Sequence, residues 1–264
     1  MDLQLKEKTA LVTGSTVGIG FAIAELLAQE GATVIVSGRS QERVDHAIAQ
    51  IRNKAPKAML KAAVADLGTQ EGCDQVIKQF PQVDILVNNV GIYDAKPFIE
   101  ISDEEWLRFF QINVMSGVRL SRHYFTPMLK QNWGRIIFVS SESGLQPPKE
   151  MVHYGMTKSA QLSIARGIAE AAEGTQITVN SVLPGPTLSE GVDEFMRNIG
   201  KERNLTPKEV EDDFFKTMRP SSLIKRFESS EEIANMVAFL CSPLASATTG
   251  ASIRVDGGVV RTIA

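Results

Sequence analysis

A glycine-rich turn near the start of the chain constrains the fold more than any other stretch. Residues 9–13 are predicted to form a short buried strand, and an apolar helical pattern covers residues 21–29. Between them lie Gly14, Gly18 and Gly20, spaced G-x-x-x-G-x-G. In this order of strand, turn and helix, a helix N-terminus can receive a pyrophosphate. The start of the chain therefore predicts the first unit of a nucleotide-binding α/β fold; an ordinary glycine-rich turn is the alternative.

Alternating strand and helix patterns continue along the rest of the chain. Strands are predicted over residues 33–37, 59–64, 83–88, 134–140, 177–183 and 251–255, and helices over residues 70–79, 102–130, 151–172 and 229–240. Capping boxes beginning at Ser102 and Thr206 support two of the helix starts. No internal repeat or linker interrupts the pattern, so residues 1–264 are predicted to form one α/β domain.

The segment 188–222 departs from this alternation. It contains short amphipathic pieces in which apolar side chains lie among charges: Phe195, Met196, Phe214, Phe215 and Met218. A segment of this length between a strand and the next helix is predicted to be a substrate lid within the single domain. Interior packing of the same side chains is the alternative.

The composition argues against several kinds of partner. A net charge of −3 and an isoelectric point near 5.8 give no electrostatic reason to expect nucleic acid or an anionic membrane. No run reaches the roughly 18 apolar residues of a membrane span, and the start of the chain has no apolar leader. Cys73 and Cys241 lack neighbours with zinc spacing, so we expect reduced thiols and no metal site in a cytoplasmic protein.

Tyr154 and Lys158 are the strongest candidates for chemistry. Four residues apart in a predicted helix, they share one face. An ammonium beside a phenol lowers the pKa of the phenol, which would let Tyr154 act as an acid or base near neutral pH. Ser141, at the end of the strand 134–140, could hold a substrate oxygen against that phenol. For an isolated pair, a solvated helix edge would be the alternative.

Arg39 bears on the choice of cofactor. In an NAD-binding unit an acidic residue is expected at the end of the second strand, where it contacts the ribose. Here Gly38 and Arg39 occupy that position, and an arginine can bind a 2′-phosphate with two hydrogen bonds. This strand end predicts NADP over NAD, with a solvated loop cation as the alternative.

Three further polar residues lie where the predicted strands end or inside a helix. Asp66 follows the third strand, where it could accept a hydrogen bond from an adenine amino group or cap the next helix. Asn89 follows the fourth strand, at the edge where open α/β sheets bind ligands. Asn113 lies inside the predicted helix 102–130, where asparagine is mildly unfavourable, so a specific role is expected.

Together these motifs resemble those of the short-chain dehydrogenases/reductases of about 250 residues. The resemblance runs nearly end to end, through Thr13-Gly14-x3-Gly18-Ile-Gly20, Asp66-Leu67, Asn88-Asn-Val-Gly91, Asn113, Ser141, Tyr154-x3-Lys158, Pro184-Gly185 and Asp256-Gly-Gly258. Two departures are Val90, where the family usually has Ala, and the lack of Lys or Arg between Gly14 and Gly18. Arg39 would therefore supply a preference for NADP largely alone.

The resemblance implies a single-domain Rossmann-type fold, a doubly wound parallel sheet of seven strands with helices on both faces. It makes Tyr154 the proton donor in carbonyl reduction and the base in the reverse direction. Lys158 would lower the pKa of Tyr154 and hold the nicotinamide ribose, Ser141 would steady the substrate oxygen, and Asn113 would organise a water bridging Lys158 to solvent. The implied cofactor contacts are Gly14, Ser15, Ile19, Arg39, Asp66, Leu67, Asn89, Gly91, Tyr154, Lys158, Pro184, Gly185 and Thr187.

These implications predict an NADP(H)-dependent oxidoreductase, with NAD(H) possible, that interconverts a carbonyl and a secondary alcohol on a small, fairly apolar molecule. The alternatives are a 3-ketoacyl reductase, an NAD-dependent alcohol dehydrogenase, a sugar dehydratase or epimerase, and a non-catalytic cofactor-binding regulator. Glu142, Gln146, Glu150 and His153 flank the catalytic groups and would either touch the substrate or face water. The family also implies a homodimer or homotetramer.

Overall fold

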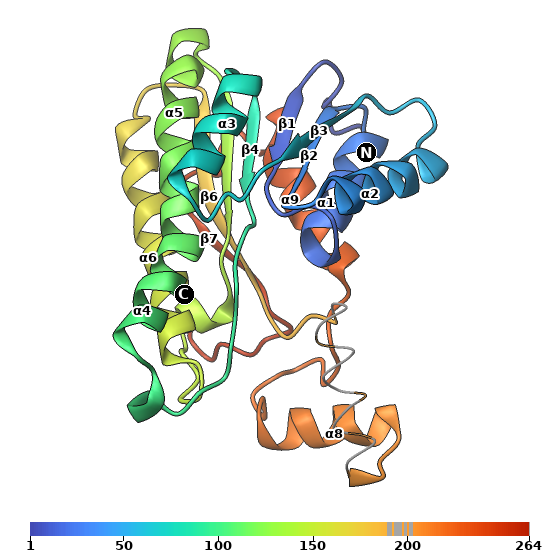
Figure 1. Cartoon of the computed structure of the whole chain (residues 1–264), viewed down its shortest axis with the longest axis vertical. Helices are drawn as coiled ribbons and strands as arrows, with labels where there is room; N and C mark the ends of the chain where they lie inside the picture. Colours follow the sequence, from blue (N-terminus) through green and yellow to red (C-terminus); the bar gives the residue numbers. More distant parts are fainter. Residues whose placement is uncertain (189–191, 193–196, 198–199, 201–202, 264) are drawn as a thin grey trace.

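The computed structural model describes residues 1–264 except 189–191, 193–196, 198–199, 201–202 and 264. At its centre is a seven-stranded parallel sheet with the order β3-β2-β1-β4-β5-β6-β7 (Figure 1). The strands are β1 (Thr9–Val12), β2 (Thr33–Gly38), β3 (Leu60–Val64), β4 (Ile85–Asn88), β5 (Gly134–Val139), β6 (Ile177–Pro184) and β7 (Ser252–Val255). The predicted doubly wound α/β fold is confirmed.

Helices cover both faces of the sheet and bury two separate apolar cores. One face carries α1 (Gly18–Gln29), α2 (Gln41–Lys54) and α9 (Ser230–Cys241); the other carries α3 (Gln70–Gln79), α5 (Ser116–Gln131) and α6 (Val152–Ala171). Strands between two helical layers are apolar on both sides, which is why β1, β4 and β5 consist almost wholly of buried residues. In the described part of the chain, no helix has both the length and the apolar character needed to cross a bilayer.

The strand order reverses between β1 and β4, which pair in parallel from Ala10 with Ile85 to Val12 with Val87. Ligands of open α/β sheets bind beyond the carboxyl ends of the strands at such a reversal. The glycine turn after β1 and the asparagines at the end of β4 both lie at this edge. The sheet thus brings together the two motifs that the sequence predicted to meet.

The predicted continuous helix over residues 102–130 is interrupted. Helix α4 (Asp103–Phe110) is followed by the π-helix η2 (Gln111–Met115) and then by α5. Asn113 lies within η2, and its side chain bonds both backbone groups of Ile92. A π-turn adds a residue to the helix and redirects its side chains, a feature that often occurs at functional sites.

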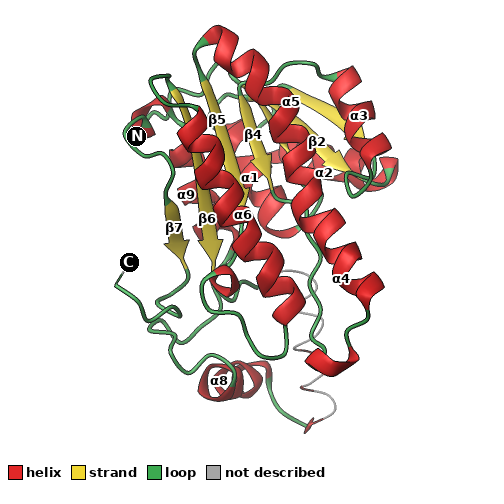
Figure 2. Ribbon diagram, turned by 90° about the vertical axis from the view of Figure 1, so that its left-hand side faces the viewer, coloured by secondary structure: helices red, strands yellow, loops and turns green. Residues whose placement is uncertain are grey.

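Helix α8 (Pro207–Thr217) lies beyond the carboxyl ends of the strands (Figure 2). It begins at the predicted capping box of Thr206. Phe215 is 2% exposed and packs with Val210 and Phe227 in a small core of its own, whereas Met218 is exposed. For Phe215 the packing alternative is therefore correct; Phe195 and Met196 of the predicted lid lie outside the described residues.

Candidate active site

Ser141, Tyr154 and Lys158 come together where β5 ends and α6 begins. Lys158 is 4% exposed, and its Nζ donates a hydrogen bond to the carbonyl of Val139 at 2.9 Å. That nitrogen lies 5.5 Å from the centre of the Tyr154 ring. Ser141 is buried at the second residue after β5, and its hydroxyl interacts with Tyr154. The spacing that suggested a shared helix face for Tyr154 and Lys158 therefore corresponds to a real cluster.

Asn113 links this cluster to the loop after β4. Its Nδ2 donates to the carbonyl of Ile92 at 2.9 Å and to Thr157 Oγ1 at 3.0 Å. Its backbone carbonyl accepts from Gln161 Nε2 at 2.6 Å, and Lys158 Nζ lies 3.4 Å from Gln161 Oε1. The amide of Gln161 thus connects Asn113 to Lys158, a contact that the sequence analysis did not identify.

The glycine turn fits an anionic group at the start of α1. Gly14 has φ +62°, and a Cβ on Gly20 would lie only 2.3 Å from the carbonyl oxygen of Gly14. Asn89 holds the turn, since its Nδ2 donates to the carbonyls of Thr13 and Gly14. At the helix N-cap, Val17 has no side chain that could accept from the first free N–H groups, and the first turn contains no acidic residue. These donors can therefore bind the pyrophosphate of a dinucleotide.

The predicted adenosine contacts lie along the same edge. Arg39 is exposed at the end of β2 and makes no hydrogen bond or ion pair within the described residues. Asp66 Oδ1 accepts from the N–H of Gly68, and the N-cap of α3 is Thr69, so the helix-cap alternative for Asp66 is wrong. Ser15 is turned inward, with its hydroxyl bonded to the carbonyl of Val12. Its backbone N–H donates to the carbonyl of Ser37 at 2.9 Å, so both hydrogen-bond donors of Ser15 already have partners within the protein.

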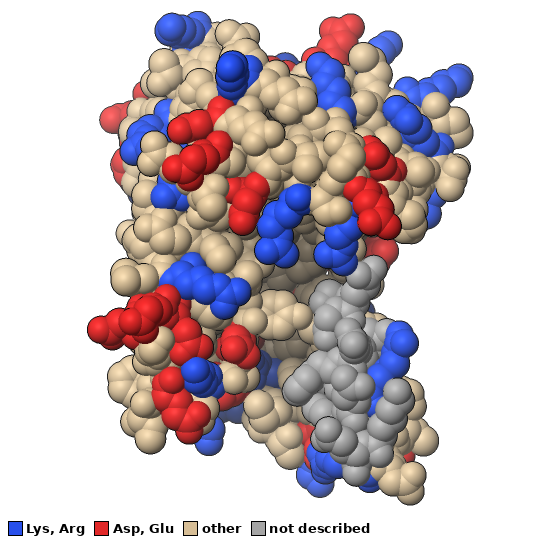
Figure 3. All heavy atoms as spheres, in the orientation of Figure 1, with Lys and Arg blue, Asp and Glu red and all other residues tan. Residues whose placement is uncertain are grey.

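At the other end of the site, β6 leads into the turn containing Gly185 and Thr187. The N–H of Gly185 donates to the backbone of Val255 at 2.9 Å and to Glu228 Oε2 at 3.0 Å. Thr187 Oγ1 donates to the carbonyl of Gly185. Figure 3 shows a hollow between the body of the molecule and the α8 segment, with Lys and Arg side chains along its upper rim.

Sequence comparison decides the family. The short-chain dehydrogenase model matches residues 8–199. The chain belongs to the short-chain dehydrogenase family. A relative at 51% identity is the uncharacterised oxidoreductase YvaG of Bacillus subtilis, with both chains covered completely. The 3-oxoacyl-[acyl-carrier-protein] reductase FabG of Aquifex aeolicus is 33% identical, over 98% of this chain and all of the relative.

The structure of L-sorbose reductase from Gluconobacter frateurii, solved with NADPH and L-sorbose, superimposes with a TM-score of 0.94 at 32% identity. All of both chains is covered. This short-chain dehydrogenase is accordingly an oxidoreductase that acts on CH–OH and C=O groups with a nicotinamide cofactor.

The protonation state of the two site residues in this short-chain dehydrogenase corrects one expectation. Burial lowers the pKa of Lys158 to about 8. Burial also raises the pKa of Tyr154, and the carboxylate of Glu142 raises it further, while the hydroxyl of Ser141 acts in the opposite direction. The predicted lowering of the Tyr154 pKa by Lys158 does not hold in this arrangement, because desolvation of the phenol outweighs the opposing effects of the Ser141 hydroxyl and the Arg219 guanidinium.

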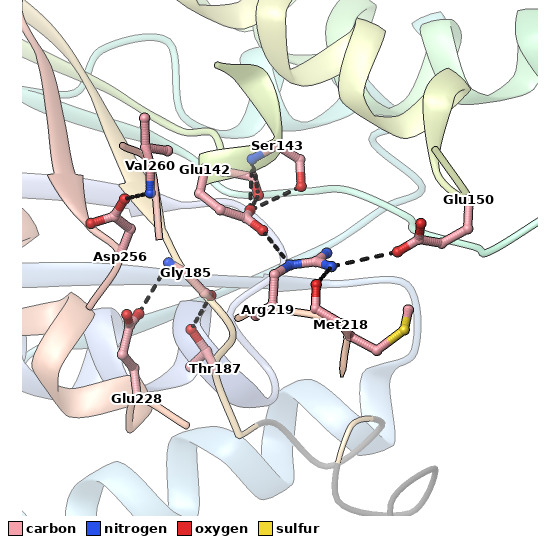
Figure 4. A network of polar contacts seen from close by, with 11 residues as sticks. Glu142, Ser143, Glu150, Gly185, Thr187, Met218, Arg219, Glu228, Asp256 and Val260 are labelled. Carbon is pink, nitrogen blue, oxygen red and sulfur yellow. Dashed lines mark hydrogen bonds and ion pairs between the residues drawn. The ribbon is translucent and has the colours of Figure 1, made fainter. Parts of the chain in front are cut away.

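A buried ion pair next to Ser141 escaped the sequence analysis. Arg219 Nε donates to Glu142 Oε1 at 3.1 Å, and Arg219 Nη1 lies 3.5 Å from Glu150 Oε1 (Figure 4). Glu142 and Glu150 were candidates as loop residues, but nothing in a linear pattern pairs them with Arg219. Arg219 does lie within the predicted lid, residues 188–222. Its position in that segment was therefore the one indication of a role in the site, since an arginine by itself indicates none.

The position of His153 differs from the expectation that it would touch the substrate or face water. His153 is fully buried against Phe109, with the ring centroids 4.1 Å apart, and is neither a rim contact nor a substrate ligand. Burial lowers the pKa of His153, and neither ring nitrogen has a hydrogen-bond partner among the described residues.

Glu228 is 3% exposed, and burial raises its pKa to about 8. No motif in the sequence indicated a role for Glu228.

Proposed function

We propose that this short-chain dehydrogenase is an NADP(H)-dependent oxidoreductase that interconverts a ketone and a secondary alcohol on a small molecule. The observation that carries the proposal is the cluster of Ser141, Tyr154 and Lys158 beside the glycine turn. An α/β sheet with this cluster at its carboxyl edge has a proton donor next to a nicotinamide-binding surface. The same cluster argues against a non-catalytic regulator.

The cofactor would lie along the carboxyl ends of the strands. The N-terminus of α1 and the turn at Gly14 would bind its pyrophosphate, Asp66 its adenine, and Gly185 with Thr187 the nicotinamide end. The exposed guanidinium of Arg39, just after β2, has no partner among the described residues, which favours a 2′-phosphate at that position. The NADPH bound by L-sorbose reductase supports the same choice. When bound, the nicotinamide supplies the hydride in reduction and accepts it in oxidation.

The residues of the chain would handle the proton. In reduction Tyr154 donates its hydroxyl proton to the substrate oxygen, and in oxidation it accepts one. Lys158 would hold the ribose and provide positive charge, while Ser141 orients the substrate oxygen. Burial favours the neutral phenol in this structure, which is the form required for carbonyl reduction.

The surroundings of Ser141 refine the expected substrate. Glu142, Ser143 and Arg219 make this side of the site polar. We therefore replace the expectation of a fairly apolar substrate with a small ketone that carries hydroxyl groups. L-sorbose, the ligand of the reductase that superimposes on this chain, is a molecule of that class.

A carrier-bound 3-ketoacyl substrate is the second candidate, supported by the identity with FabG. The acidic residues of α8 were expected to repel an acidic carrier. Lys208 lies within ion-pair distance of both Glu211 and Asp212, and Arg203 pairs with Asp213, so two cations offset part of that negative charge. The repulsion expected from the sequence is therefore weakened.

A substrate panel tests both candidates. NADPH oxidation should be followed with hydroxyketones, apolar ketones and an acetoacetyl thioester, each repeated with NADH. Highest kcat/KM for a hydroxyketone with NADPH is the expected result. A preference for the thioester would favour the ketoacyl reductase, and inactivity throughout would contradict the proposed reaction.

A further inference from the structure

Glu142 follows Ser141 directly and contacts it through a buried carboxylate. Ser141 Oγ donates to Glu142 Oε2 at 2.5 Å, and the N–H and hydroxyl of Ser143 donate to the same oxygen at 2.6 and 2.9 Å. The Glu142 side chain is only 6% exposed. Removing a carboxylate from water to this depth costs free energy, which hydrogen bonds and a nearby positive charge can offset.

Arg219 provides that positive charge from a distant part of the chain. Its Nε donates to Glu142 Oε1 at 3.1 Å across 77 residues of sequence. Its Nη1 donates to the carbonyl of Met218 at 2.9 Å and points toward Glu150 (Figure 4). Because the Arg219 side chain is 13% exposed, solvent and salt screen the pair weakly.

The pair acts on Tyr154 in two opposite ways. The Glu142 carboxylate raises the pKa of the phenol, whereas the Arg219 guanidinium lowers it. The other groups that face Tyr154 are the Ser141 hydroxyl, which lowers this pKa, and Tyr93 from the loop after β4, which raises it. On α6 itself, Lys158 Nζ lies 5.5 Å from the ring centre.

We propose that Glu142 and Arg219 are a positioning pair, which orients the Ser141 hydroxyl and sets the charge that acts on Tyr154. Glu142 holds the Ser141 hydroxyl in one orientation, and Arg219 shares the carboxylate so that its charge does not suppress ionisation of Tyr154. Because a serine hydroxyl has one proton and Ser141 donates it to Glu142, the carboxylate competes with the substrate oxygen for that proton. This assignment rests on the proposed function, since it requires Tyr154 and Ser141 to act on a substrate oxygen.

The pH dependence of kcat in alcohol oxidation tests the pair. Oxidation requires ionised Tyr154, so kcat rises with pH through the apparent pKa of that group. Arg219→Gln should move this rise to higher pH by about one unit, and Glu142→Gln should move it to lower pH by a similar amount. The double variant, again without net charge at the pair, should return to within about half a unit of wild type.

Two further variants separate charge from structure. Arg219→Lys keeps the charge and should retain a profile close to wild type, which a purely structural role of the guanidinium fork would not predict. Arg226→Gln breaks the ion pair with Glu232 away from Ser141 and changes the net charge equally. Its profile should remain unchanged. The proposal would be overturned if Glu142→Gln and Arg219→Gln moved the rise of kcat in the same direction of pH, or if neither moved it.

A stability measurement remains informative if no substrate is found. The melting temperatures of Glu142→Gln, Arg219→Gln and the double variant form a thermodynamic cycle that needs no catalysis. We expect the double variant to lose clearly less than the two single losses together, because each single variant leaves a buried group without its partner. Additive losses would show that the residues do not interact. If the melting temperatures showed that the two residues interact but the wild type were inactive on every substrate, the proposed reaction would be rejected. The role of Glu142 and Arg219 in that reaction would then be rejected as well.

Discussion

At the scale of single residues, Tyr154 bears most directly on the chemistry. Replacing it with Phe removes the hydroxyl and keeps the ring. Turnover should fall at least about a hundredfold, the lower end of what general acid catalysis contributes. NADPH affinity, measured by fluorescence titration, should change little because the packing of the ring is retained. Turnover near the wild-type value on a confirmed substrate would exclude Tyr154 as the proton donor.

The second prediction for a single residue concerns Arg39 and the preference for NADPH over NADH. Hydrogen bonds to a charged group contribute about 1.5–3 kcal/mol, or roughly ten- to a hundredfold in affinity. Arg39→Ala should lower kcat/KM for NADPH by that factor and leave the value for NADH nearly unchanged. Arg43, also exposed and one helical turn further on, is the matched control. An effect of Arg43→Ala as large as that of Arg39→Ala would assign the phosphate contact to both residues.

The residues of the candidate active site differ in how far a sequence can predict them. Tyr154 and Lys158 are close in sequence, so helical geometry alone places them together. Arg219 and Glu142 are 77 residues apart, and only the packing of the segment after α8 against the loop after β5 joins them. Similarly, the pKa of Tyr154 depends on burial, which a motif does not contain.

At the scale of elements, Glu228 connects the turn after β6 to the start of α9. Its Oε2 accepts from Gly185, while its Oε1 has no hydrogen-bond partner among the described residues. Burial raises the pKa of Glu228 from 4.5 to about 8. A raised pKa means that the folded state favours the protonated acid. The stability gained in this way is complete at pH values below the unfolded pKa and is lost as pH rises through the folded pKa.

Glu228→Gln should therefore remove an alkaline instability. One unit of pKa shift is worth about 1.4 kcal/mol, so between pH 6 and pH 9 the wild type should lose about 3 kcal/mol that the variant retains. In thermal melts this difference is roughly 5–10 °C. Glu231→Gln removes an exposed carboxylate from the same helix end and should follow the wild type. Parallel pH dependence of Glu228→Gln and the wild type would show that Glu228 is ionised in the folded protein.

The elements themselves were largely predictable, and the exceptions have physical causes. The boundaries of α3, Gln70–Gln79, follow from its apolar periodicity and its Thr69 cap. The π-helix Gln111–Met115 could not be predicted, because the apolar pattern continues through it and the side chain of Asn113 within it makes a tertiary contact. That contact joins Asn113 to Ile92, whose position depends on β4.

At the scale of the whole molecule, exposed apolar side chains gather at and just before α4. Phe98, Ile99 and Leu107 are 61%, 90% and 64% exposed, and Phe110 is 36% exposed. Several large apolar side chains exposed on neighbouring parts of the chain favour an interface. Together with the family resemblance, they favour the homodimer or homotetramer expected from the sequence, with these side chains covered by a second copy of the chain.

Light scattering at micromolar concentration should accordingly give a multiple of the 28.8 kDa chain mass. Leu107→Arg places a charge in the proposed interface, where burial would leave it unpaired, and should shift the population toward smaller species. Met59 is equally exposed, at 65%, but lies beside the outermost strand β3. Met59→Arg should leave the mass unchanged. A wild-type protein that scatters only as a single chain would exclude this interface, and equal dissociation by both variants would place the contact elsewhere.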